Sequence, residues 1–179
     1  MILAARPQLE AMLERLPKLP AGLRCTRLHG DYRLAQVLVA QGDVMLIDFE
    51  GESGRSMAER RAKGLPLADV AGMVRSFDLA AWTSVSRFAE TDPQAPERLS
   101  APATAWRDLA VGAFLAEYET GISGCPSWPG AAAETLMRWE LLARLGRELT
   151  SDAAHRPARL AAAVARLTQL LKTMGDPSP

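Results

Sequence analysis

The most informative stretch of the chain is LHGDYRLAQVL at residues 28–38, which is followed by IDFEG at residues 47–51. Two apolar, β-branched runs lie where these motifs adjoin: VLV at residues 37–39 and VMLI at residues 44–47. The residues AQGD separate the two runs. Alternating apolar runs around a glycine turn are typical of a β-hairpin, with Gly42-Asp43 supplying the turn. The pattern therefore predicts a hairpin with polar residues just before its first strand and just after its second.

Two carboxylates flank this predicted hairpin, because Asp31 precedes its first strand and Asp48 follows its second. A hairpin returns its far end to its start, so the two side chains are expected to lie near each other at one mouth. Gln36 adds an amide oxygen between Asp31 and the first strand. Such an oxygen-only donor set suits Mg²⁺, and a carboxylate beside the metal can accept a hydroxyl proton. The combination predicts phosphoryl transfer.

Composition places the chain among ordinary globular proteins. It has 179 residues, of which 48% are hydrophobic and 23% charged, enough for one domain with a real core. Basic and acidic residues are equal in number, at 21 each, so no broad charge favours nucleic acid or an anionic membrane. No apolar run approaches the ~18 residues of a membrane helix, and no signal pattern opens the chain. We expect a cytoplasmic protein with neither a nucleic-acid nor a membrane partner.

Helical periodicity dominates outside the hairpin. Residues 51–65 are expected to form a loop or a short exposed helix, and Pro66 fits the first turn of a long one. Helices are predicted over residues 8–16, 66 to about 88, a segment around Trp106 that ends at Gly121, about 131–149 and about 157–173. One hairpin among helices predicts an α+β fold that is mostly helical.

The order of these motifs resembles the phosphotransferases of the aminoglycoside and choline kinase type, which share the protein-kinase fold. The shared features are His-Gly-Asp, an amide residue five positions on, a hairpin and then Ile-Asp-Phe-Glu. More narrowly, the glutamine at position 36 and the segments at residues 58–63 and 66–78 resemble bacterial maltokinases. The resemblance is dense over residues 24–82. It implies the C-terminal lobe of a kinase-like fold, with the hairpin carrying the catalytic loop.

The resemblance implies a role for each polar residue at the mouth of the hairpin. Asp31 would be the catalytic base that orients or deprotonates the sugar hydroxyl. Gln36 and Asp48 would hold Mg²⁺, and Glu50 would bind in the region of the nucleotide and metal. ATP would be the co-substrate.

Two further residues would support the catalytic loop. His29 would buttress it, and Asp69 would accept hydrogen bonds from its backbone. For Asp69 the residues alone leave a second interpretation open, since a carboxylate in the first turn of a helix is favoured by the helix dipole.

The nucleotide-binding half of such a kinase is not recognisable in this sequence. A kinase-like fold needs a phosphate-covering loop and a strand lysine, and a complete one runs to roughly 250 residues. The stretch before His29 is too short for these parts, and its single lysine, Lys18, lies between two prolines. We therefore expect a partial C-terminal lobe over residues 1–175, a tail at 176–179 and no N-terminal lobe. Within it, residues 28–52 would carry the catalytic and metal loops and residues 66–175 a helical subdomain.

The function implied is that of the C-terminal part of an ATP-dependent kinase that converts maltose to maltose 1-phosphate in trehalose and glycogen metabolism. It would be inactive without the missing lobe, and its partners would be maltose and that lobe or trehalose synthase. Two alternatives stay open: a non-catalytic remnant that binds trehalose synthase or a sugar, or a kinase of the same fold for an amino sugar or another alcohol. Arg33 and Ala35 replace the His and Gly usual in maltokinases and bear on the choice of sugar.

Overall fold

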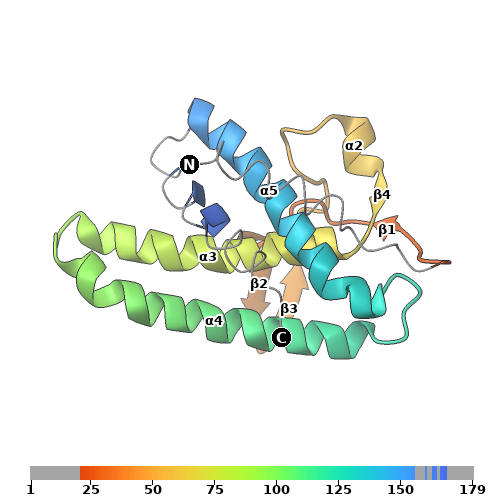
Figure 1. Ribbon diagram of the computed structural model, residues 1–179, viewed down its shortest axis with the longest axis horizontal. Coiled ribbons are helices and arrows are strands. Elements are labelled where there is room, and N and C mark those ends of the chain that lie inside the picture. Colours follow the sequence, from red (N-terminus) through yellow and green to blue (C-terminus); the bar gives the residue numbers. More distant parts are fainter. Residues whose placement is uncertain (1–20, 156–159, 161–162, 165, 169–179) are drawn as a thin grey trace. The chain divides into compact units, whose positions relative to one another are not determined.

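A computed structural model of the chain describes residues 21–155, 160, 163–164 and 166–168. Figure 1 shows its helices and strands. The chain divides into two compact units. The larger unit, Gly22–Trp128, contains all the candidate site residues, and the other contains the segment from Pro129 onward. Each unit is described separately below. The helix expected at residues 8–16 and the tail at 176–179 lie outside the described residues.

The predicted hairpin is confirmed. Strand β2 (Val37–Ala40) pairs antiparallel with β3 (Asp43–Leu46). The turn residues are Gln41 and Gly42, with φ of 53° and 81°, because the tight turns that match strand twist need left-handed backbone. The expected Gly42-Asp43 turn is therefore wrong by one residue, since Asp43 already pairs with Ala40.

A second two-stranded sheet was not predicted. Strand β1 (Thr26–Arg27) pairs antiparallel with β4 (Lys63–Gly64), so it joins the residues just before the catalytic motif to the end of the following loop. Between β3 and β4 lies the short helix α2 (Met57–Arg61), whose N-terminus is closed by a reciprocal capping box of Ser56 and Glu59. The short exposed helix expected in this region is confirmed.

Two long antiparallel helices form the bulk of the larger unit (Figure 1). Helix α3 (Leu67–Ala89) begins directly after Pro66, as predicted, and buries Leu67, Val70 and Val74. Helix α4 (Ala95–Ile122) ends close to the predicted Gly121. Its start at Ala95 places Pro96 in the first turn, where a proline is tolerated. The α+β fold, mostly helical with small sheets, is confirmed.

Buried charges join α3 to α4. The guanidinium of Arg107 on α4 lies 3.5 Å from the Asp78 carboxylate on α3, and that of Arg75 lies 3.9 Å from the same carboxylate. Removing one partner of such a buried set leaves a charge without compensation, which costs several kcal/mol (about 3–5). The set therefore favours one alignment of the two helices.

The second unit contains the short turn η3 (Gly130–Ala132) and helix α5 (Ala133–His155), which extends beyond the predicted end at about residue 149. The helix expected over residues 157–173 falls largely outside the described residues. None of the helices in the described part of the chain has the length and apolarity that crossing a membrane requires.

Candidate functional site

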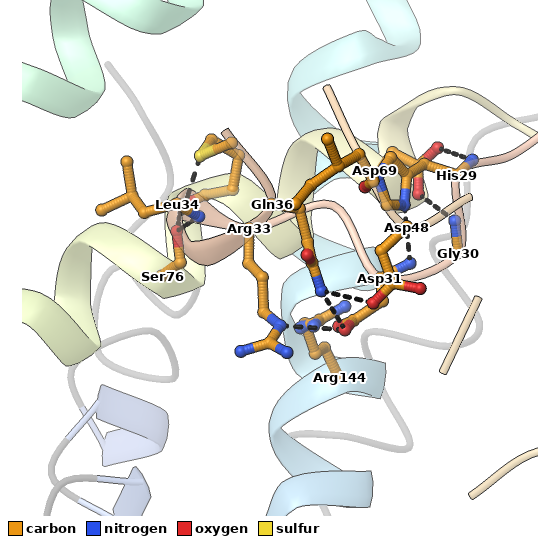
Figure 2. Close-up of polar contacts among 12 residues, drawn as sticks. His29, Gly30, Asp31, Arg33, Leu34, Gln36, Asp48, Asp69, Ser76 and Arg144 are labelled. Carbon is orange, nitrogen blue, oxygen red and sulfur yellow. Dashed lines mark hydrogen bonds and ion pairs between the residues drawn. The ribbon is translucent and has the colours of Figure 1, made fainter. Parts of the chain in front are cut away.

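The structure brings together the three polar residues at the mouth of the hairpin (Figure 2). Gln36 lies at the end of the short turn η2 (Leu34–Gln36), and its side-chain nitrogen donates hydrogen bonds to two carboxylates. The distances are 2.9 Å to Oδ2 of Asp48 and 3.3 Å to Oδ2 of Asp31. The buried Gln36 amide thus contacts two acidic side chains, one from the segment before β2 and one from the segment after β3.

Arg33 forms an ion pair with the proposed catalytic base. Its Nε donates to Oδ2 of Asp31 at 2.9 Å, the same oxygen that Gln36 contacts. The Asp31 side chain is mostly buried, whereas Arg33 is half exposed. A guanidinium that reaches in from the surface can hold a carboxylate in one orientation and still move away when a substrate arrives.

His29 connects the candidate catalytic loop, residues 29–34, to the segment that carries Asp48. Its Nε2 lies 2.9 Å from the carbonyl oxygen of Ile47, and the backbone N–H of Asp31 donates to its Nδ1 at 3.4 Å. One neutral tautomer, with the hydrogen on Nε2, satisfies both contacts. The ring also stacks on Phe49 at a centroid distance of 4.6 Å. The buried His29 therefore ties the two loops together through polar and apolar contacts.

Asp69 holds the start of the catalytic loop. It lies in the first turn of α3, and its carboxylate accepts the backbone N–H of His29 at 2.7 Å and that of Gly30 at 2.9 Å. These two donors point to different oxygens of one carboxylate, so a single side chain satisfies both.

Ser76 holds the other end of the loop, and sequence reasoning missed it. Its Oγ accepts the backbone N–H of Leu34 at 3.0 Å and donates to the carbonyl of Met73 at 2.9 Å. Ser76 follows Asp69 by close to two helical turns on α3, so both face the loop. That spacing was the available signal, although a serine in a helix more often bonds only within its own helix.

Glu50 is not brought to the group around Gln36 by any contact among the described residues. Its side chain is 82% exposed, and Arg60 lies 4.0 Å from its carboxylate. Arg60 also donates to the Glu50 backbone carbonyl at 3.4 Å. Arg60 of α2 therefore packs against the loop after Asp48.

The two loops meet at a pair of glycines. Gly30 has a φ of +82°, and a Cβ added there would lie 3.0 Å from the Cα of Gly51. A residue with a side chain would be strained by the left-handed backbone and would also push the two loops apart.

Gly30→Ala is expected to lower the free energy of unfolding by more than Gly22→Ala does. Both glycines have a φ of +82°, but a Cβ on Gly22 meets nothing within 4 Å. The left-handed backbone alone costs about 1–2 kcal/mol in each variant. Urea unfolding measures the difference between the two variants, which isolates the contact with Gly51. Equal losses would show that the loops do not touch at this point.

A cavity of about 340 Å³ lies beside the catalytic loop. Its lining includes His29, Phe49 and Asp69 together with both tyrosines of the chain, Tyr32 and Tyr118. Burial raises the pKa of Tyr118 to about 12, and the Asp69 carboxylate adds to the shift. Burial and Asp69 also raise the pKa of Tyr32. The fold therefore favours the neutral phenol of both residues.

The tyrosine titration gives a pH prediction. Because the pKa of Tyr118 is raised from 10 to about 12 in the folded chain, its stabilising contribution is complete below pH 10. It is lost as the pH rises from 10 to 12. Absorbance at 295 nm should show both tyrosines ionising above pH 10 in the folded chain, and Tyr118→Phe should remove the higher step. A Tyr118 ionisation near pH 10 in the folded state would contradict this prediction.

The donor set around Gln36 fits a small hard cation. Asp31 and Asp48 each turn one carboxylate oxygen toward the Gln36 amide nitrogen, and a cation at that position would be attracted by both negative charges. Rotating the amide by about 180° would present its oxygen instead, completing a carboxylate and carbonyl set of the kind Mg²⁺ prefers. Within the described residues there is no cluster of three or more His, Cys, Asp and Glu that could hold a metal ion. The candidate protein ligands are therefore the glutamine oxygen and Asp48, with Asp31 beside the metal as the candidate base.

Comparison with known proteins finds similarity to glucosamine kinases. A glucosamine kinase of Streptacidiphilus jiangxiensis is 32% identical over 103 residues, which make up 58% of this chain and 22% of that protein. A crystal structure of glucosamine kinase superposes with a TM-score of 0.78 and 27% identity over 95% of this chain and 40% of the kinase. No protein-family model matches the chain.

A second solved structure contains ligands. It is a glucosamine kinase in complex with glucosamine, ADP and inorganic phosphate, with a TM-score of 0.75 and 26% identity over 95% of this chain and 41% of the kinase. The chain is thus homologous to glucosamine kinase, a sugar kinase, and shares its fold over the matched part. It spans less than half the length of these relatives.

Proposed function

We propose that the chain is the catalytic-loop part of an ATP-dependent sugar kinase. The observation that carries the proposal is the Gln36 amide that gathers Asp31 and Asp48 in a chain homologous to glucosamine kinase. Phosphoryl transfer needs a base at the attacking hydroxyl and oxygen ligands for Mg²⁺, and little further covalent chemistry from the protein. These three residues supply both.

Asp31 is the catalytic base in this proposal. The sugar hydroxyl attacks the γ-phosphorus of ATP, its proton passes to the Asp31 carboxylate, and the bond to ADP breaks. Arg33 and Gln36 hold this carboxylate in place before the reaction, and His29 accepts the backbone N–H of the same residue. Asp69 and Ser76 act through the loop backbone and are positioning residues.

Gln36 and Asp48 would hold Mg²⁺. When bound, the ion neutralises negative charge on the nucleotide phosphates. Glu50, exposed at the end of the same segment, is proposed to contact the nucleotide side of the site. The use of ATP agrees with a cytoplasmic location, which stays part of the proposal.

Glucosamine is the leading candidate for the acceptor sugar, because both solved relatives described above are glucosamine kinases and one of them binds glucosamine. Maltose is the second candidate. It is favoured by Gln36 and by the segments at residues 58–63 and 66–78 that resemble maltokinases. Trehalose synthase would be a partner only in the maltose case. A non-catalytic remnant would bind sugar without transferring phosphate.

The test is a chimera in which this chain replaces the matched part of the crystallised glucosamine kinase. With ATP and Mg²⁺, the chimera is expected to release ADP when glucosamine is added, whereas residues 1–179 alone should show no measurable turnover. Maltose as the acceptor separates the two candidates. Turnover by the isolated chain would remove the need for a further lobe, and a folded chimera that phosphorylates neither sugar would favour the remnant.

A further inference from the structure

The two cysteines of the chain lie on segments that a backbone hydrogen bond joins. The N–H of Arg24 donates to the carbonyl oxygen of Pro126 at 3.0 Å. Cys25 directly follows Arg24 and Cys125 directly precedes Pro126, although the two cysteines are 100 positions apart in the sequence. Because consecutive Cα atoms are only about 3.8 Å apart, this hydrogen bond keeps both cysteines in one small region of the larger unit.

Tyr118 provides a second link between the two cysteines. Burial raises the pKa of Tyr118 to about 12, and the Asp69 carboxylate and the Cys125 thiol add to the shift, so Cys125 lies near this phenol. Tyr118 also lines the cavity beside the candidate catalytic loop together with Thr26, the residue that follows Cys25. The cavity lining and the backbone hydrogen bond therefore place the two cysteines at the same side of this unit.

Both thiols are accessible, and the backbone that carries each of them is held in place. Cys25 and Cys125 are free cysteines and both are exposed. The N–H of Cys125 donates to the carbonyl of Ile122 at 2.9 Å, and its own carbonyl accepts the N–H of Trp128 at 2.9 Å. Cys25 lies between the hydrogen-bonded Arg24 and strand β1. A small reagent can thus reach both sulfur atoms while the fold keeps their segments together.

We propose that Cys25 and Cys125 form a reversible disulfide in the folded chain, by exchange with a low-molecular-weight disulfide such as oxidised glutathione. One cysteine thiolate attacks a sulfur of glutathione disulfide, whose S–S bond breaks and releases one glutathione thiolate. The thiolate of the other cysteine then attacks the protein sulfur of this mixed disulfide and releases the second glutathione. Two protein thiols are thereby oxidised, one glutathione disulfide is reduced, and the two protons pass to the glutathione thiolates.

The disulfide would tie the segment that leads into the candidate catalytic loop to the turn after α4. Strand β1 begins directly after Cys25 and ends two residues before His29. A disulfide across a long loop restricts the unfolded chain strongly, so oxidation is expected to stabilise the folded state. Its formation does not depend on kinase activity, and it can therefore be tested apart from the proposed function.

The first experiment identifies the product of oxidation. Chain 1–179 is equilibrated with mixtures of reduced and oxidised glutathione, quenched with acid, alkylated and analysed by mass spectrometry. The expected product is a monomer that has lost two hydrogen atoms and yields one peptide pair linked through Cys25 and Cys125. Disulfide-linked dimers, or chains that carry glutathione on both cysteines, would overturn the proposal.

The matched control moves one thiol along α4. Cys125→Ser combined with Leu109→Cys places the second cysteine at a position that is 76% exposed and thirteen residues before the end of the helix, about 20 Å along its axis. This variant should take up glutathione on both thiols and form no internal disulfide. An internal disulfide as abundant as in the unchanged chain would show that the positions of Cys25 and Cys125 are not special, which contradicts the proposal.

The second experiment measures how much the fold favours the disulfide. The equilibrium constant for exchange with glutathione should be at least about tenfold larger in the folded chain than in concentrated urea, because the fold holds the thiols together. Oxidation should accordingly raise the urea midpoint of unfolding, and Cys25→Ser should remove this increase. Equal constants in the folded and unfolded chain, or a midpoint that oxidation leaves unchanged, would overturn the proposal.

Discussion

Asp31→Asn in the chimera is expected to lower kcat by about 10²–10⁴-fold, the range that a positioned general base contributes. The asparagine keeps the size of the side chain but cannot accept the hydroxyl proton. Loss of the pairing with Arg33 should itself cost little stability, because that arginine is half exposed and can be hydrated instead. Steady-state kinetics with glucosamine, together with thermal unfolding of each variant, measures both effects.

Asp92→Asn is the matched control. Asp92 lies in the turn between α3 and α4 and is also paired with an arginine, Arg98, so the same charge and the same kind of ion pair are removed. Its kcat should stay within about twofold of the unchanged chimera. An Asp31→Asn chimera as active as this control would exclude Asp31 as the base.

Asp69→Ala is expected to lower the free energy of unfolding of the chain by about 3 kcal/mol or more. The carboxylate accepts two backbone N–H groups, and each hydrogen bond to a charged group contributes roughly 1.5–3 kcal/mol. Alanine leaves both donors without their acceptor at the start of the catalytic loop. Urea unfolding followed by circular dichroism measures the loss.

Asp69→Asn gives the graded comparison. The two N–H groups point to different oxygens of Asp69, and asparagine keeps only one of them, so its amide hydrogens would face the other N–H group. An intermediate loss is therefore expected. If both variants unfolded within about 0.5 kcal/mol of the unchanged chain, the helix-dipole interpretation of Asp69 would be favoured, since that effect is worth a few tenths of a kcal/mol to about 1 kcal/mol at the surface.

Sequence reasoning succeeded where the determining information was local. The apolar runs around Gly42 predicted the hairpin, and the hairpin's topology alone required Asp31 and Asp48 to approach each other. The long helix after Pro66 followed from its periodicity and its first-turn proline. These features depend only on near neighbours in the sequence.

Long-range pairing was the part that the sequence could not supply. Strands β1 and β4 are too short for any periodicity, and the whole hairpin and the loop after it lie between them in the sequence. The contact of Ser76 with Leu34 joins two distant segments and depends on how α3 packs under the loop. The exposure of Glu50 likewise follows from the course of the loop after Asp48, which no residue pattern determined.

The spacing of Asp69 and Ser76 on α3 determines where both ends of the candidate catalytic loop are held. A helix turns by about 100° for each residue, so the interval between these two positions returns to within about 20° of the starting direction. Adding or removing one residue between them would rotate one anchor by about 100° and detach one end of the loop. In the proposed mechanism, Asp31, Gln36 and Asp48 therefore take their positions from the register of a helix that itself carries none of them. In proteins with these two anchors, changes of length between the two positions should be tolerated far less than changes of residue type.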